Sequence, residues 1–223
     1  MSRLFAIGDI HGCFDPFYDL VVNAVRLKKT DRLILLGDYI DRGPRSREVI
    51  DFIVDLKEKG FDITALTGNH EQMLLASAGS SELMDLWFMN SGMITLESFG
   101  ISDPSLLDRH YLDFFRSLEF YLDTGPFLFV HAGFNDDMED PFFDRETMVW
   151  VCRAGYRNPL LSGKTIVHGH RPKRLDFVEK LIAERSQVLP IDTGCVYGKE
   201  SGYGYLSALE VFSMELFSVS CSG

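Results

Sequence analysis

The feature that most restricts the fold is a unit that occurs three times within the first 75 residues. In each copy a short apolar run leads into a polar, glycine-flanked loop, and a segment with apolar residues at helical spacing follows. The apolar runs are residues 3–7, 33–36 and 63–66. In the first copy, Asp15 and Pro16 predict an N-cap and the first helical position. The repetition predicts a layered α/β fold whose loops gather at one edge.

The rest of the chain is consistent with one domain spanning residues 1–223. Residues 72–122 are helical in pattern but irregular, and we interpret them as a helical insertion packed on the sheet, with a lid or substrate platform as the alternative. Residues 134–148 contain six acidic side chains and predict a solvated loop. Further strands are expected at 127–130 and 165–167, and a β-hairpin at 205–219.

Composition and charge limit the class of protein. Of the 223 residues, 46% are hydrophobic and 25% are charged, which is typical of a globular chain with a full core. The formal charge of −11 argues against nucleic acid or an anionic membrane as a partner. An anionic substrate stays compatible with this charge because bound divalent cations can reverse the sign of a local site.

Three absences in the sequence pattern favour a cytoplasmic protein. The apolar run near the N-terminus is too short for a signal peptide, and no run reaches the roughly 18–20 apolar residues that span a bilayer. The four cysteines show no CxxC spacing, so neither a zinc ribbon nor a disulfide framework is indicated.

Side chains that can ligate metal ions follow five of the expected strands. They are Asp9 and His11, then Asp38 and Asp41 with Arg42, then Asn69 and His70, then His131, and finally His168 and His170. Ligands of α/β proteins bind outside the carboxyl ends of strands, where these loops should meet. Nitrogen, carboxylate and amide ligands without thiolate suit Mn, Fe or Zn better than Ca or Mg. We therefore expect a pair of divalent transition-metal ions, an arrangement used to hydrolyse phosphate esters.

Three sequence blocks carry a resemblance to a known family. They are Gly8-Asp9-Ile10-His11-Gly12, Gly37-Asp38-Tyr39-Ile40-Asp41-Arg42-Gly43 and Gly68-Asn69-His70-Glu71. With His131-Ala132-Gly133 and Gly169-His170 downstream, the chain resembles the PPP-type serine/threonine protein phosphatases, in particular short bacterial and phage members of the calcineurin-like metallophosphoesterases. The resemblance covers nearly the whole chain. It implies a two-sheet α/β core flanked by helices, with a dimetal site at the strand ends.

The resemblance also implies a ligand set. Asp9, His11 and Asp38 would hold the first ion, and Asp38 would bridge to the second. The ligands completing the second ion would be Asn69, His131 and His170. Mn is the favoured ion, with Fe or Zn as alternatives, and a hydroxide between the ions would attack phosphorus.

The same resemblance assigns the remaining roles. His70 would be the general acid that protonates the leaving group, with Asp41 orienting its ring. Arg42 would bind the phosphoryl oxygens. For Glu71 we favour a simpler interpretation, an acidic residue in the first turn of a helix. His168 is expected to orient a ligand or to pack beneath the ions.

One departure from the family pattern concerns a second phosphate-binding arginine. Short bacterial members carry it as Trp-x-Arg, whereas this chain has Trp150-Val151-Cys152-Arg153. The arginine is displaced by one position. We favour Arg153, with Arg157 as the alternative.

The predicted activity is hydrolysis of phosphomonoesters, with phosphoserine or phosphothreonine in a protein or peptide as the favoured substrate. Symmetrical cleavage of bis(nucleosidyl) tetraphosphates is the alternative, and the absence of a basic cluster in residues 72–122 argues against it. A third hypothesis is a catalytically silent phosphate-binding module. The completeness of the predicted ligand set argues against that one.

Overall fold

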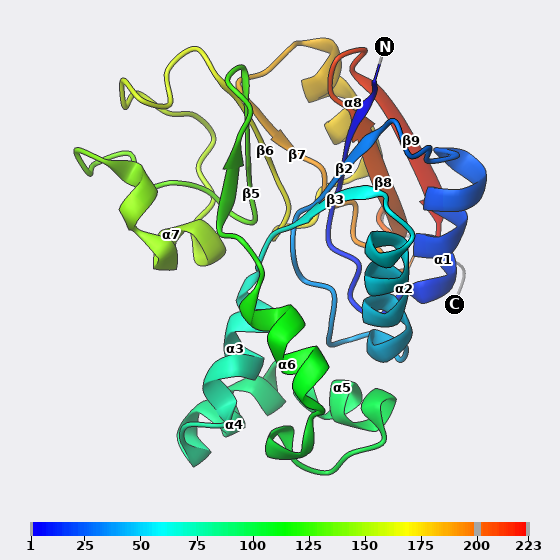
Figure 1. The fold of residues 1–223 in the computed structure, drawn as a ribbon. Coiled ribbons are helices and arrows are strands. Elements are labelled where there is room, and N and C mark those ends of the chain that lie inside the picture. Colours follow the sequence, from blue (N-terminus) through cyan, green and yellow to red (C-terminus); the bar gives the residue numbers. More distant parts are fainter. Residues whose placement is uncertain (1, 199–201, 222–223) are drawn as a thin grey trace.

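The structure is a computed structural model that describes residues 2–198 and 202–221 (Figure 1). Its strands form two mixed sheets, and each sheet combines parallel and antiparallel pairs. The first sheet has the order β3-β2-β1-β8-β9 and the second the order β4-β5-β6-β7. The predicted α/β class with a two-sheet core is therefore confirmed.

The strands of the first sheet are β1 (Leu4–Ile7), β2 (Arg32–Leu35), β3 (Asp62–Ala65), β8 (Tyr205–Glu210) and β9 (Glu215–Ser220). Those of the second are β4 (Tyr121–Asp123), β5 (Phe127–Val130), β6 (Thr165–His168) and β7 (Val188–Pro190). The helices are α1 (Phe14–Asp19), α2 (Ser46–Glu58), α3 (Asn69–Ser77), α4 (Ser81–Met89), α5 (Gly92–Phe99), α6 (Arg109–Arg116), α7 (Arg145–Trp150) and α8 (Leu175–Ala183). A π-helical turn (Leu20–Ala24) extends α1, and short 3-10 turns occupy Pro104–Leu106 and Pro141–Phe143.

Alternation along β1 places its side chains in two different apolar clusters. In β1, Leu4 and Ala6 belong to the apolar cluster that the two sheets share, and Phe5 and Ile7 belong to the cluster on the opposite face. This second cluster includes residues of α1 and α2, which cover that face of the first sheet. Both faces of β1 are therefore buried, which explains why its sequence is continuously apolar.

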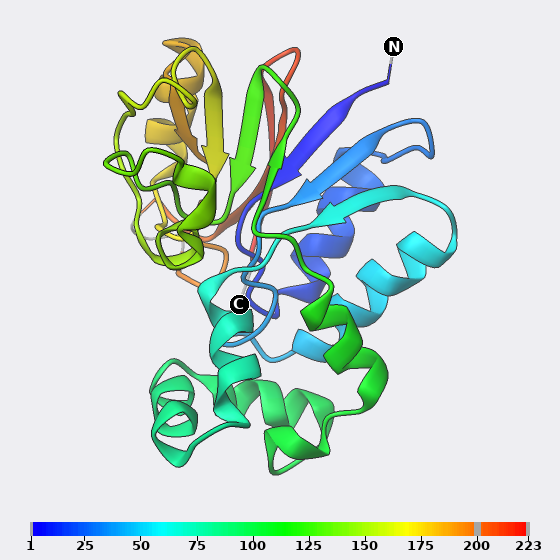
Figure 2. The ribbon, with the colours of Figure 1, turned by 60° about the vertical axis from the view of Figure 1, so that its left-hand side comes forward.

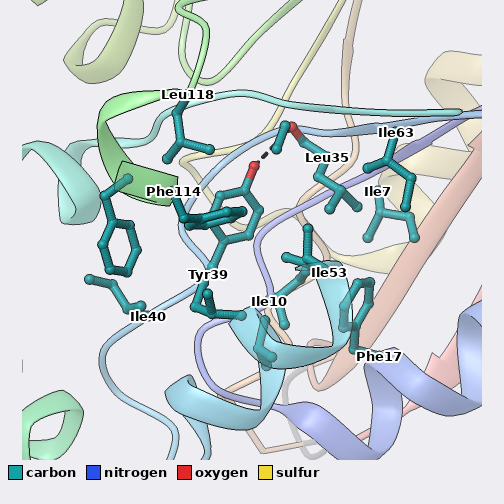
Figure 3. Close-up of a cluster of buried hydrophobic side chains, with 14 of the residues drawn as sticks. Ile7, Ile10, Phe17, Leu35, Tyr39, Ile40, Ile53, Ile63, Phe114 and Leu118 are labelled. Carbon is teal, nitrogen blue, oxygen red and sulfur yellow. Dashed lines mark hydrogen bonds between the residues drawn. The ribbon is translucent and has the colours of Figure 1, made fainter. Parts of the chain in front are cut away.

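Tyr39 anchors the loop after β2 in the larger core cluster (Figure 3). Its ring packs edge-on against Phe114 of α6, with 6.2 Å between ring centroids. Its hydroxyl donates to the carbonyl oxygen of Leu66 at 2.6 Å and lies 3.2 Å from that of Leu35. A loop tip with a fully buried tyrosine at its centre is held in one position.

Helices α3 to α6 group together below the two sheets (Figures 1 and 2), and α5 of this group contacts α2. Within the predicted helical insertion at 72–122, the structure has α4, α5 and α6 together with most of α3. Its last residues begin strand β4 of the second sheet. No helix in the described part of the chain is long and apolar enough to cross a bilayer.

Several expected boundaries were wrong. Helix α1 begins at Phe14 with Cys13 as its N-cap, so Asp15 and Pro16 already lie inside the first turn. Proline needs no amide hydrogen in the first turn, and the backbone tolerates it there. The predicted loop at 134–148 contains the start of α7, whose cap Asp144 accepts a hydrogen bond from the Thr147 amide. Strands β4 and β7 and helix α8 were not predicted.

Candidate metal centre and active site

The predicted ligands do converge. Asp9 and His11 follow β1, Asp38 follows β2, Asn69 opens α3 after β3, and His131 and His170 follow β5 and β6. Parallel strands run toward the same edge, so loops far apart in the sequence meet there. Five of these six side chains are buried, and His170 is half-buried.

Four potential ligand atoms surround one point between the sheets. The Nε2 atom of His131 lies 3.0 Å from Oδ1 of Asn69, 3.2 Å from Nδ1 of His170 and 3.4 Å from Oδ2 of Asp38. The Nδ1 atom of His131 lies 2.9 Å from the Leu36 carbonyl oxygen, which places the ring proton on Nδ1 and a lone pair on Nε2. The lone pairs of these nitrogen and oxygen atoms point toward one another, an arrangement that can bind a cation.

A second group of ligand atoms lies on the other side of Asp38. The Nε2 atom of His11 is 3.6 Å from Oδ2 of Asp38 and 4.0 Å from Oδ2 of Asp9. Its Nδ1 atom lies 2.9 Å from the carbonyl oxygen of Ile40, so Nε2 again presents its lone pair. Arg42 donates to this nitrogen at 2.7 Å, and its guanidinium must turn aside for His11 to ligate an ion. Asp38 lies in both ligand groups, as a bridging carboxylate would.

The protonation of these residues fits divalent cations. Burial lowers the pKa of His11 and of His170 to about 3, and it also lowers that of His131, so the three rings are neutral. Burial, followed by the nearby carboxylates of Asp192 and Asp38, raises the pKa of Asp9. Neutral imidazoles and crowded buried carboxylates form a donor set that a pair of cations would stabilise.

The backbone is in a left-handed conformation at several of the predicted ligand positions. His11, Asp38 and His170 have φ angles of 46°, 52° and 67°, and Asp41 and Arg42 have φ angles of 69° and 68°. Such left-handed conformations are uncommon outside glycine and persist where the surrounding structure enforces them. Their concentration here indicates that the loops are shaped to aim these side chains.

Two glycines leave space for the ligands. A Cβ atom on Gly68 would overlap Oδ1 of Asp38, and one on Gly169 would overlap Oδ1 of Asp9. The glycines that flank the motifs are therefore required by the close approach of backbone to carboxylate.

His70 and Asp41 form a buried pair beside the ligands. Their Nδ1 and Oδ2 atoms are 2.6 Å apart, and Nε2 of His70 lies 3.9 Å from Oδ2 of Asp38. Trp87 donates to Oδ2 of Asp41 at 2.8 Å, and Thr95 donates to Oδ1 at 2.6 Å. Burial acts to lower the pKa of His70, but Asp38 and Asp41 together outweigh it and raise the pKa. The raised pKa favours the proton-carrying imidazolium.

The role of Glu71 is wider than the predicted one. It lies in the first turn of α3, as expected, and bonds back to the N-cap amide of Gly68. Its carboxylate also accepts hydrogen bonds from the amides of Asp38, at 2.9 Å, and Tyr39, at 2.8 Å. One buried side chain thus fixes both the start of α3 and the loop that carries Asp38. The sequence signal for this role was the position of Glu71 three residues after Gly68, which is the spacing of a capping box.

Asp192 belongs to the site but was given no role from the sequence. It is buried, accepts a hydrogen bond from the Gly194 amide at 2.9 Å, and lies near enough to Asp9 to raise its pKa. Burial raises the pKa of Asp192 itself to about 7. The signal was the strand-like run that precedes Asp192-Thr193-Gly194.

The structure does not bring the two candidate arginines into contact with these groups. Arg153 pairs with Asp137 at 2.8 Å, and the backbone amide of Arg157 bonds to Asp136. A phosphate-binding role for Arg153 stays a prediction. His168 is buried, with Nδ1 donating to the Gly169 carbonyl at 2.9 Å and lying 3.7 Å from Sγ of Cys152.

Comparison with known proteins agrees with this geometry. The family model described as calcineurin-like phosphoesterase matches residues 2–206. The asymmetrical bis(5'-nucleosyl)-tetraphosphatase PrpE of Bacillus velezensis is 28% identical over 219 residues, covering 87% of this chain and 85% of the relative. Serine/threonine-protein phosphatase 1 of Salmonella typhimurium is 28% identical over 211 residues, covering 88% of each chain.

Among solved structures, that of a protein proposed to be a diadenosine tetraphosphatase aligns with a TM-score of 0.65 at 21% identity. The alignment covers 100% of this chain and 95% of the other, and it supports the fold alone. The match of the family model over nearly the whole sequence decides the family. The chain belongs to the calcineurin-like phosphoesterases, metal-binding hydrolases with a dimetal site.

Proposed function

We propose that this phosphoesterase hydrolyses phosphomonoesters with two divalent transition-metal ions, of which Mn suits the ligands best, and that its substrates are phosphoserine and phosphothreonine in proteins. The observation that carries the proposal is the position of the His70–Asp41 pair. Nε2 of His70 lies 3.9 Å from the shared ligand Asp38, and Nη2 of Arg42 lies 3.2 Å from the same nitrogen. A proton donor and a phosphate-binding cation thus flank one ligand cluster.

Each residue of the site has its own role in the reaction. When bound, the ions act as Lewis acids and lower the pKa of water so that it can attack phosphorus at neutral pH. Arg42 binds the phosphoryl oxygens through its planar guanidinium and orients the ester. Nε2 of His70 gives its proton to the leaving alkoxide. Asp41 holds the His70 ring through Nδ1 and stabilises its charged form.

A polypeptide substrate is supported by the surface of α4 and α5. These helices expose the apolar side chains of Leu83, Leu86, Met89 and Met93, of which Met89 is 78% and Met93 57% accessible. On the buried faces of the same helices, Trp87 and Thr95 donate hydrogen bonds to Asp41. Exposed apolar side chains beside a catalytic site favour contact with another polypeptide.

The test is a comparison of kcat/KM on a phosphothreonine peptide and on diadenosine tetraphosphate. Protein loaded with Mn and protein treated with a chelator are assayed in parallel. The proposal expects metal-dependent turnover of the peptide at a rate at least equal to that of the nucleotide. An advantage of about 100-fold for the nucleotide, or roughly 2.7 kcal/mol in transition-state stabilisation, would overturn it.

The second candidate substrate is a bis(nucleosyl) tetraphosphate, supported by the name of the Bacillus velezensis relative and by a basic cavity. This cavity of about 310 Å³ is lined by Arg153, Arg171 and Lys173, with Phe177 among its apolar lining residues. Within residues 2–198 and 202–221, neither Arg171 nor Lys173 forms an ion pair. Cations beside an aromatic ring suit a substrate with several phosphates and a base.

Product analysis separates the two modes of nucleotide cleavage. Symmetrical hydrolysis of diadenosine tetraphosphate gives two molecules of ADP, and asymmetrical hydrolysis gives AMP and ATP. Failure to release either pair would remove the second candidate.

A further inference from the structure

Three of the four cysteines gather at one cavity outside the ligand cluster. Cys13 caps α1, Cys195 follows the Asp192 loop, and Cys221 follows β9. All three line a cavity of about 370 Å³. These residues come to the cavity from three separate segments of the chain. All three are unpaired by disulfides in the structure. Segments distant in the sequence thus bring three thiol side chains to one cavity.

The same cavity reaches the candidate active site. Its lining includes Arg42, which we assign to phosphate binding, and Gly12, which joins Cys13 to His11. The amide of Gly12 bonds to the Tyr39 carbonyl at 2.8 Å, and a Cβ atom on Gly12 would overlap the carbonyl oxygen of Gly43. Because these backbone segments are in contact, Gly12 couples the position of Cys13 to that of the predicted ligand His11. A displacement of Cys13 is therefore transmitted to the site.

Disulfide formation fits this cluster better than metal binding does. Within the described ranges, the groups whose ligand atoms are close enough to share an ion consist of histidine and aspartate, and the three thiols are not among them. A disulfide requires only two sulfur atoms to meet. Cys13 and Cys221 are half-buried, so a small polar oxidant can reach the cluster through the cavity.

We propose that Cys13 is an oxidation site, at which hydrogen peroxide produces a reversible disulfide to Cys195 or Cys221 and thereby lowers the phosphoesterase activity. In the first step the Cys13 sulfur attacks one peroxide oxygen, the O–O bond breaks, and water leaves with the thiol proton. In the second step the partner sulfur attacks the sulfenic sulfur, the S–O bond breaks, and a second water leaves. The two sulfur atoms lose two electrons in total, and the peroxide gains them.

The expected loss of activity follows from geometry. A disulfide holds its sulfur atoms about 2 Å apart, closer than any non-bonded contact, so Cys13 has to leave its reduced position, and we expect part of this shift in its backbone. Gly12 cannot absorb the shift because Gly43 is packed against it. His11 and Arg42 therefore leave their productive positions. A dithiol reductant restores them by breaking the bond.

The test treats the full-length Mn-loaded protein with peroxide at stoichiometric amounts. Mass spectrometry should show the loss of two hydrogens and a linked peptide that contains Cys13. After peroxide removal, activity is assayed with fresh Mn, so oxidation of the ion cannot explain a loss. We expect kcat to fall about fivefold or more, equal to roughly 1 kcal/mol in the barrier, and to recover with dithiothreitol.

Serine variants make the test specific. Cys152→Ser is the matched control, because this fourth cysteine lies against His168 away from the cluster, and it should respond like the unmodified chain. Cys13→Ser, and the double variant Cys195→Ser with Cys221→Ser, should form no such disulfide and keep their activity under peroxide. A disulfide that lacks Cys13, no disulfide at all, or equal loss of activity in Cys13→Ser would overturn the proposal. The mass readout is independent of which substrate the enzyme uses.

Discussion

Nδ1 of His70 and Oδ2 of Asp41 lie 2.6 Å apart in a fully buried pair, and the helical segment below the sheets supplies two further donors to the same carboxylate. This helical segment therefore contributes to the candidate site. It fixes Asp41, and through Asp41 it fixes the ring that we assign as proton donor.

Replacing His70 by asparagine should leave the metal content unchanged and slow the reaction according to the leaving group. Loss of a general acid typically lowers kcat by about 10²–10⁴-fold when the leaving group is a poor one. An alkyl phosphate should be affected in this way, whereas p-nitrophenyl phosphate needs little protonation and should be slowed much less. Steady-state kinetics on both esters measures the difference. Equal slowing of both would contradict the assignment.

Thr95→Val should weaken both stability and turnover. The valine keeps the shape of threonine but removes the hydroxyl that donates to Oδ1 of Asp41 and accepts from the Asp41 amide. The variant leaves Oδ1 of Asp41 without this donor, and the Asp41 amide keeps only Ser46 Oγ, at 3.2 Å, so we expect a cost of about 1–3 kcal/mol in the free energy of unfolding. Urea denaturation measures this loss, and we expect kcat to fall about tenfold, or roughly 1.4 kcal/mol. Thr95→Ser keeps the hydroxyl and should stay close to the unmodified chain; an equal defect there would point to packing instead.

Asp38→Asn should abolish activity and reduce the content of both ions. Among the described residues, Asp38 is the carboxylate that lies within 4 Å of all three rings, those of His11, His70 and His131, and its loss removes charge from both ligand groups. Metal analysis of purified protein, with activity after Mn add-back, is the measurement. Near-normal turnover with two bound ions would refute the bridging role.

Arg42→Ala should weaken the binding of inorganic phosphate. The guanidinium lies beside His11 and His70 and has no carboxylate partner in the described part of the chain. Its removal should raise the inhibition constant of phosphate by about tenfold, the equivalent of roughly 1.4 kcal/mol. Unchanged inhibition would exclude Arg42 from the site.

Gly169→Ala should lower metal affinity although it adds a single methyl group. Its Cβ atom would overlap Oδ1 of Asp9, which already accepts a hydrogen bond from the His170 amide at 3.0 Å. Titration of the metal-free protein with Mn should show weaker binding. Gly155→Ala is the control, because its Cβ atom would meet only ordinary contacts, and it should bind Mn normally. A normal titration for both variants would contradict the close approach.

The convergence of ligands could be predicted from sequence because strand, loop and helix repeat with apolar strands that end in polar residues. The spacing of the apolar residues, and the position of each polar residue directly after a strand, suffice to place Asp9, Asp38 and His131 at the edge where these strands end. Contacts between side chains that are distant in the sequence leave no such periodic pattern. Nothing local to Trp87 or Thr95 reveals that they point at Asp41, because their partner lies about 50 residues away and helical spacing alone marks them as core.

The wrong boundaries have a common physical cause. Helix α1 was placed late because Asp15-Pro16 is itself a good helix start, whereas the helix begins two residues earlier, at Phe14. Helix α7 was hidden by the acidic composition of 134–148, where Asp144 serves as a cap rather than as a solvated charge. The cysteine cluster has no sequence signal either, since its members come from three separate elements.

The order of strands in the first sheet also determines when the enzyme can become active during its synthesis. Strand β1 pairs with β2 on one side and with β8 on the other, where Phe5 lies opposite Glu210 and Ile7 opposite Ala208. One edge of the strand that leads to Asp9 and His11 thus stays open until residues 205–210 have been synthesised. A chain cut short before residue 205 would leave this edge of β1 without its pairing strand and open to pairing with other polypeptides.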